Sequence, residues 1–156
     1  MSRYAEVLVL APYMDEVMEP LTREDDGSDP GRTWSGAFTP VRLDWGGPLL
    51  GHVRAAEFER VRSRTGLLKH LESLPWPYPE SLQVMIRDQD DECFGLWMMQ
   101  DGRLVEIALP RTRRFHEPAP PANEFPPDPG YLLRTDTGRP LPEQTPPERR
   151  DPRPAW

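Results

Sequence analysis

The densest group of side chains that could carry chemistry is a run of carboxylates at residues 88–92. Asp88, Asp90, Asp91 and Glu92 could form a carboxylate pair for acid–base catalysis, or they could bind a metal ion through their oxygens. They lie between two segments with the pattern of β-strands, where polar residues are expected in a turn whatever the function. We therefore predict a solvated turn at these residues and no metal site.

The other chemically active side chains lack the spacing of a catalytic or metal site. Carboxylates at 15–19 begin an expected helix, whose dipole favours negative charge there, and the acidic loop 24–33 lacks the ordered ligands of a calcium loop. The single cysteine, Cys93, and the three histidines have no metal-type spacing. Motifs of serine hydrolases, zinc peptidases, C-x-x-C proteins and phosphate-binding loops are missing from the sequence. The sequence thus predicts no catalytic residue, no metal and no cofactor.

The most unusual short motif is Trp45-Gly46-Gly47-Pro48. Its two glycines allow backbone conformations that other residues resist, and Trp45 adds a large apolar surface beside them. The motif predicts either a tight turn packed under the tryptophan or a loop that faces a ligand. A phosphate-binding loop would need more glycines, a lysine and a following helix, which this segment lacks.

Proline divides the chain of 156 residues into two parts. Twelve of the 21 prolines follow residue 117, and the residues before them are numerous enough for one hydrophobic core. We predict an α+β domain at residues 1–111 and a proline-rich, extended tail at residues 112–156 that is largely without secondary structure.

Five apolar side chains interrupt this tail and are spaced like anchors. They are Phe125, Tyr131, Leu132, Leu133 and Trp156. Burying a large apolar side chain returns roughly 1.5–3 kcal/mol, whereas ordering a residue costs about 1–2 kcal/mol, so these anchors can hold only a local stretch. We expect residues 125–134 to dock on the domain or on a partner and residues 138–154 to stay mobile.

Hydrophobic periodicity predicts an alternating order of strands and helices. Strands are expected at residues 4–11, 34–43 and 50–59 and three more within 81–109. A helix is expected at 65–74, and Pro20 predicts either a short or kinked helix from Met14 or two turns broken near Glu19. Asp101-Gly102 is typical of a two-residue hairpin turn. This order predicts an α+β fold with a ferredoxin-like (split βαβ) antiparallel sheet, extended by a C-terminal β-hairpin, and two short helices on one face.

Two of the expected strands, at 4–11 and 93–99, are apolar at nearly every position. That pattern is typical of central strands that are covered on both faces. The predicted core consists of Val7, Val9, Leu82, Val84, Ile86, Phe94, Leu96, Trp97, Val105 and Ile107.

The acidic charge of the chain indicates which kinds of molecule it can bind. Residues 1–110 hold 19 acidic and 11 basic side chains, a net charge of −8, and the whole chain has −7. Such a domain repels nucleic acid and can face a basic protein. No apolar run is long enough to predict a membrane span, and one cysteine fits a reducing compartment.

These features predict a small acidic cytoplasmic interaction protein, of the immunity, inhibitor or adaptor type, that acts by binding a protein partner. The alternative is a small-ligand-binding protein or an enzyme with its site near Trp45-Gly46-Gly47-Pro48. The excess of Arg over Lys, 18 to one, indicates a GC-rich bacterial genome and carries no information on activity. The oligomeric state stays open.

Overall fold

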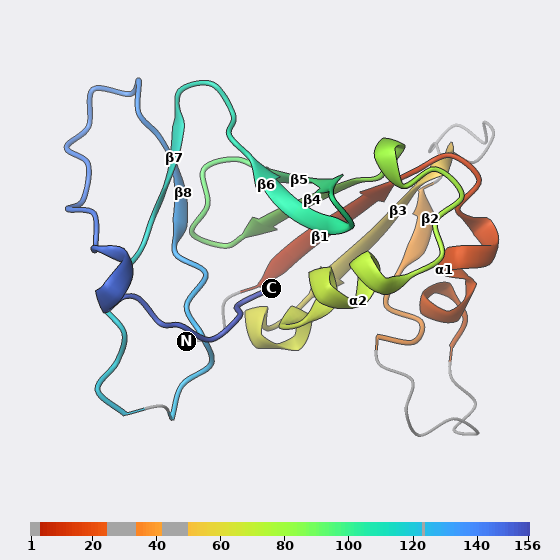
Figure 1. Ribbon diagram of the computed structural model, residues 1–156, viewed down its shortest axis with the longest axis horizontal. Helices are drawn as coiled ribbons and strands as arrows, with labels where there is room; N and C mark the ends of the chain where they lie inside the picture. The colour runs from red at the N-terminus through yellow and green to blue at the C-terminus, as the bar shows by residue number, and fades with distance from the viewer. Residues whose placement is uncertain (1–3, 25–33, 42–49, 123) are drawn as a thin grey trace.

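The computed structural model describes residues 4–24, 34–41, 50–122 and 124–156 of the chain (Figure 1). In chain order its strands, α-helices and short 3₁₀ helices (η) are β1 (Ala5–Leu10), α1 (Asp15–Thr22), β2 (Thr39–Val41), β3 (Leu50–Phe58), η1 (Val61–Arg64), α2 (Leu67–Ser73), η2 (Pro79–Ser81), β4 (Gln83–Asp88), β5 (Gly95–Gln100), β6 (Arg103–Ile107), β7 (Thr112–Phe115), β8 (Tyr131–Arg134) and η3 (Pro147–Arg149).

Six strands form one sheet in the order β2-β3-β1-β4-β5-β6, and each neighbouring pair is antiparallel. β1 lies in the interior of the sheet because it pairs with β3 on one side and with β4 on the other. α1 lies between β1 and β2 in the chain, and α2 lies between β3 and β4, so each helix belongs to a crossover between strands that are not neighbours. The predicted α+β class, with a mostly antiparallel sheet and two helices, is confirmed.

One face of the sheet carries the hydrophobic core. Along β1, Ala5, Val7 and Val9 are buried and the residues between them are partly exposed, as the two-residue period of a strand requires. α1 and α2 bury apolar side chains, among them Met18 and Leu71, in the same cluster. Both helices therefore cover this side of the sheet, which we call the helix face (Figure 1).

Two prolines mark irregular points. Of the two alternatives for the first helix, the short helix is correct: α1 has eight residues and continues through Pro20 to Thr22, with Leu21 buried and no break at Glu19. Pro40 was expected on an edge strand or at a bulge; β2 is an edge strand, and its register shifts between Pro40 and Val41. β2 is also shorter than the expected strand at 34–43.

The turn between β5 and β6 confirms the clearest local signal. Gln100 pairs with Arg103, which leaves Asp101 and Gly102 as a two-residue loop. Both have positive φ, 49° for Asp101 and 75° for Gly102. This is the conformation that a two-residue turn needs to match the twist of its strands.

The predicted core is only partly correct. Six of the ten residues are buried, namely Val7, Val9, Leu82, Val84, Ile86 and Trp97. The prediction is wrong for Val105, which is 39% exposed, and for Phe94, Leu96 and Ile107, which are partly exposed. Leu96 pairs with Ile107 and Met98 with Val105 on the side of the sheet away from the helices, whereas Trp97 between them points to the helix face.

The tail forms a second, two-stranded sheet that the sequence did not predict. β7 pairs with β8 from Thr112 opposite Arg134 to Phe115 opposite Tyr131. The backbone N–H of Glu92 donates to the carbonyl oxygen of Leu132 at 2.9 Å, which joins this hairpin to the turn before β5. Figure 1 shows the hairpin beside the large sheet.

The chain then returns to the domain. Thr145, within the stretch expected to stay mobile, is buried, and so is Ala155. The last residues lie near η1, where the guanidinium of Arg64 donates from Nη1 to the carbonyl oxygen of Ala155 at 2.8 Å (Figure 1).

The packing of α2 gives a direct test of the helix face. Leu71→Ala should lower the free energy of unfolding by about 2–5 kcal/mol, because it leaves a cavity at a fully buried position. Urea unfolding followed by tryptophan fluorescence measures this change. Lys69→Ala, on the exposed side of the same helix, is the matched control and should change stability little. A loss below about 1 kcal/mol for Leu71→Ala would mean that α2 does not pack on the sheet as described.

Candidate functional site

The side of the sheet opposite the helix face carries a broad apolar surface, which we call the open face. Strand register places alternate residues of β3, β1, β4, β5 and β6 on it, because directly paired residues of antiparallel strands point to the same side. Its apolar residues are Leu8, Leu10, Val53, Ala55, Met85, Leu96, Met98, Val105 and Ile107.

These residues form two rows that run across five strands. In the first row Ala55, Leu8, Met85, Leu96 and Ile107 are successive register partners. In the second row Val53, Leu10, Gln83, Met98 and Val105 are successive partners. Gln83 is the only polar residue in these two rows, so the apolar surface that they form is nearly continuous.

None of the open-face residues belongs to the hydrophobic cluster of the helix face. Each is partly exposed or, for Val105, exposed. Within the described ranges, both α-helices pack on the other side of the sheet. Contact of apolar side chains with water is unfavourable, and contiguous apolar patches at a surface typically mark interaction sites.

One end of the open face is acidic. A third row consists of the register partners Glu57, Glu6 and Arg87. Arg87 Nη1 donates to Glu6 Oε2 at 3.1 Å, whereas the side chain of Glu57 is exposed. Two carboxylates against one guanidinium leave a net negative charge at this end. A groove of about 410 Å³ lies here, lined by Leu8, Ala55 and Phe94 as well as by both glutamates.

The carboxylates at 88–92 lie at the predicted turn between β4 and β5, and Asp90 is exposed, but Asp88 and Asp91 are not solvated as the sequence predicted. Asp88 and Asp91 are each only 3% exposed. Asp88 Oδ1 accepts a hydrogen bond of 2.8 Å from Nε of Arg64, a residue that is 0% exposed, and a second guanidinium nitrogen bonds the other oxygen. The prediction is wrong because these carboxylates have a buried cation and buried backbone groups to bind, which nothing in the local sequence indicates.

Asp91 has a structural role in the same turn. Its two oxygens accept hydrogen bonds from the backbone N–H of Asp88 at 3.0 Å and of Leu132 at 2.7 Å. Burial raises the pKa of the Asp91 carboxyl above its ordinary value, although the guanidinium of Arg114 and both N–H donors act in the opposite direction. In the part of the chain that the structure describes, no group of three or more His, Cys, Asp or Glu side chains is arranged to hold a metal ion.

The tail anchors have different surroundings. Phe125 is 64% exposed, whereas Leu132 is buried in β8 between Tyr131 and Leu133. Trp156 packs on Trp97 with 4.8 Å between ring centroids. These contacts hold part of the tail on the domain itself, and any contact of the anchors with a partner stays a prediction.

Trp156 also lies between two cations. The guanidinium carbons of Arg64 and Arg114 are 4.5 Å and 4.8 Å from its ring centroid. Cation–π contacts of this kind are favourable and gain strength when they are desolvated. Trp156 therefore joins the tail to the buried Arg64–Asp88 pair.

Trp45, Gly46, Gly47 and Pro48 lie outside the described residues. Neither the tight turn nor the ligand-facing loop is tested, and a small-ligand site at this motif stays a prediction. The open face was missed at the sequence level although its signal was present: strands that are apolar at every position supply side chains to both faces of a sheet.

Comparison with known protein families, characterised proteins and solved structures finds no match to this chain. None of the helices in the described ranges is long and apolar enough to cross a membrane.

The buried ion pair yields a second test. Asp88→Asn keeps the size of the side chain but removes the charge that faces Arg64, and a buried charge without a counter-charge typically costs about 3–5 kcal/mol of stability. Urea unfolding at pH 7 measures this loss. Asp90→Asn, at an exposed position of the same turn, is the matched control and should leave the midpoint nearly unchanged. A similar midpoint for the two variants would show that Arg64 does not depend on Asp88.

Proposed function

We propose that the chain is a small acidic interaction protein that binds a basic protein partner through the open face of its sheet. The observation that carries this proposal is the pair of partly exposed apolar rows across five strands, with an acidic groove at one end. An immunity, inhibitor or adaptor role in the cytoplasm is the corresponding biological class.

The apolar rows can supply the binding energy. Burying a large apolar side chain contributes roughly 1.5–3 kcal/mol, and the cost of association is on the order of 4–15 kcal/mol. Leu8, Leu96 and Ile107 are only partly exposed, so each contributes a fraction of that value, and a partner has to cover both rows to offset the cost. Met85 and Met98 add flexible side chains that adapt to the shape of a partner.

Charge indicates the chemistry of that partner. The chain has a net charge of −7, and the groove at the end of the open face is lined by Glu6 and Glu57. Complementary charge accelerates encounter and disfavours acidic competitors. A basic partner with an apolar contact surface fits both features, and the complex should weaken as ionic strength rises.

The strand order supports a finer description of the fold. We infer a ferredoxin-like (split βαβ) arrangement of β1 to β4 with α1 and α2 as its crossovers, extended by the hairpin of β5 and β6. The order β2-β3-β1-β4 and the helices between non-neighbouring strands support this inference. Many unrelated functions use this topology, so it adds nothing to the choice of partner.

Site-specific photo-crosslinking in the cells that naturally produce the chain tests the proposed function. A photoreactive residue at position 85 or 98 should yield an adduct with a basic protein, because both positions lie in the centre of the open face. The same residue at position 141, an exposed apolar site in the tail, is the control and should not yield that adduct.

The affinity of the chain for the purified partner is then measured. The double variant Met85→Thr/Leu96→Thr places β-compatible polar residues in the first row and should weaken binding by about tenfold or more in calorimetry, with an unchanged fold. Leu141→Thr should bind as the unaltered chain does. Adducts only with a second copy of the chain, or only with an acidic protein, would overturn the proposal.

A further inference from the structure

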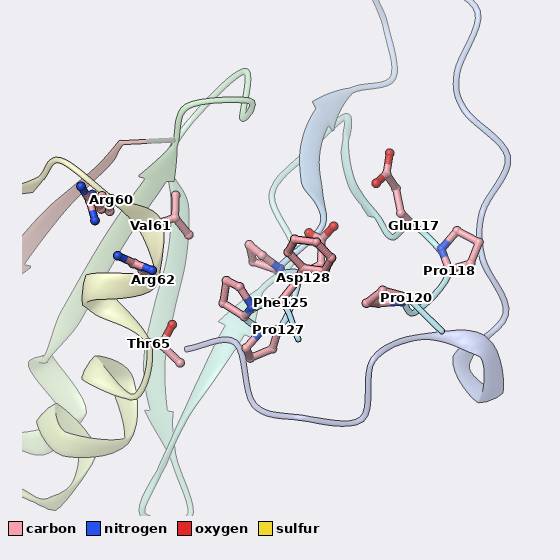
Figure 2. A pocket seen from close by; sticks show the side chains of 12 residues that line it. Arg60, Val61, Arg62, Thr65, Glu117, Pro118, Pro120, Phe125, Pro127 and Asp128 are labelled. Carbon is pink, nitrogen blue, oxygen red and sulfur yellow. The ribbon is translucent and has the colours of Figure 1, made fainter. Parts of the chain in front are cut away.

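A cleft of about 610 Å³ lies between η1 and the proline-rich residues 117–120 and 125–129 of the tail (Figure 2). Its residues are all different from those of the open face. Figure 2 shows Arg60, Val61 and Arg62 on one wall and Phe125 with Pro127 on the other. The volume falls within the range of about 300–1,000 Å³ that small-molecule sites typically occupy.

The wall of the cleft that the tail supplies is mostly apolar and rich in proline. Five of the twelve lining residues are prolines, and Phe125 adds an aromatic ring that is 64% exposed. Proline rings lose almost no side-chain entropy when a ligand covers them. An aromatic ring at the surface offers a flat partner an offset or edge-to-face contact.

The opposite wall is basic. Arg60 and Arg62 are exposed, and no ion pair links either of them to another residue in the described part of the chain. Glu117 and Asp128 belong to the proline-rich wall, and Asp128 Oδ1 accepts a hydrogen bond of 2.8 Å from the backbone N–H of Gly130. Arg60 and Arg62 thus bring two guanidinium groups to the lining of the cleft, and arginine binds anionic groups with bidentate geometry.

Both walls are held in place by contacts outside the cleft. Arg64, in the same 3₁₀ turn as Arg62, is anchored by Asp88 and by the carbonyl oxygen of Ala155. On the other side, Arg114 Nη1 donates to the carbonyl oxygen of Pro129 at 3.3 Å. The cleft is thus preformed, as ligand sites usually are.

We propose that this cleft binds a small aromatic carboxylate. The carboxylate lies against Arg60 and Arg62, and the flat apolar body lies against Phe125 and the prolines. This site is independent of the open face, so its failure would leave the proposed protein-binding function untouched, and the converse holds as well.

The experiment compares two probes of the same shape in an NMR titration of the full chain. 2-Naphthoate should shift the backbone amide signals of residues 60–65 and 124–128, because it carries both the flat ring system and the anionic group. 2-Naphthylmethanol, which lacks the charge, should bind about tenfold more weakly or worse. Equal affinity for the two probes would overturn the role of the arginines.

Variants locate the site. Arg60→Gln/Arg62→Gln and Phe125→Ala change exposed side chains, and each should weaken 2-naphthoate binding several-fold with an otherwise unchanged spectrum. Arg103→Gln, an exposed arginine of β6, is the matched control for charge, and Met85→Thr is the control for the open face. Shifts that fall on β1, β4 and β5 instead, or no shifts at millimolar probe, would overturn the proposal.

Discussion

A sheet has two faces, and the two short α-helices of this chain cover only one of them within the described ranges. β1, β4 and β5 carry large apolar side chains on both sides, so Val7, Val84 and Trp97 complete the core while Leu8, Met85 and Leu96 remain at the surface. The contacts that stabilise the fold thus lie on the helix face, and the binding that we propose lies on the opposite face of the same strands. Because the core depends on the helix face, substitutions on the open face can alter binding without removing the contacts that hold the helices in place.

The buried cation Arg64 is the second organising feature, because it connects parts of the chain that lie far apart in the sequence. It ties η1 to Asp88 of β4, and its further contacts with Ala155 and Trp156 bring the end of the described chain onto the domain. Removing one member of such a buried pair is far more costly than replacing an exposed charge. The last two residues of the proline-rich tail are held on the domain by these contacts, and other residues of the tail line one wall of the cleft beside η1.

Local patterns in the sequence predicted the elements that local physics determines. The two-residue period of β4, the apolar stripe of α2 and the positive φ at Asp101 and Gly102 all follow from neighbouring residues. The pairing of β7 with β8 and the burial of Asp88 depend on partners distant in the chain, so no window of sequence reveals them. A strand that is apolar at nearly every position is equally consistent with two covered faces and with one covered face, which is why Leu96 was assigned to the core. Val105 was assigned to it because alternation alone does not tell which face of the sheet is covered. The candidate site at Trp45 lies outside the described residues.

The sheet has one covered face and one apolar face that solvent reaches. Methionines lie on both faces, so the solvent exposure of each face can be measured at their methyl groups. Met14 and Met18 are buried on the helix face, whereas Met85 and Met98 lie on the open face. Methyl NMR of the full chain with a soluble gadolinium chelate measures how closely solvent approaches each methyl group. We predict strong relaxation enhancement for Met85 and Met98 on the open face and weak enhancement for Met14 and Met18 on the helix face. Equal protection of all four methyl groups would contradict it, because the open face would then be covered by the chain itself.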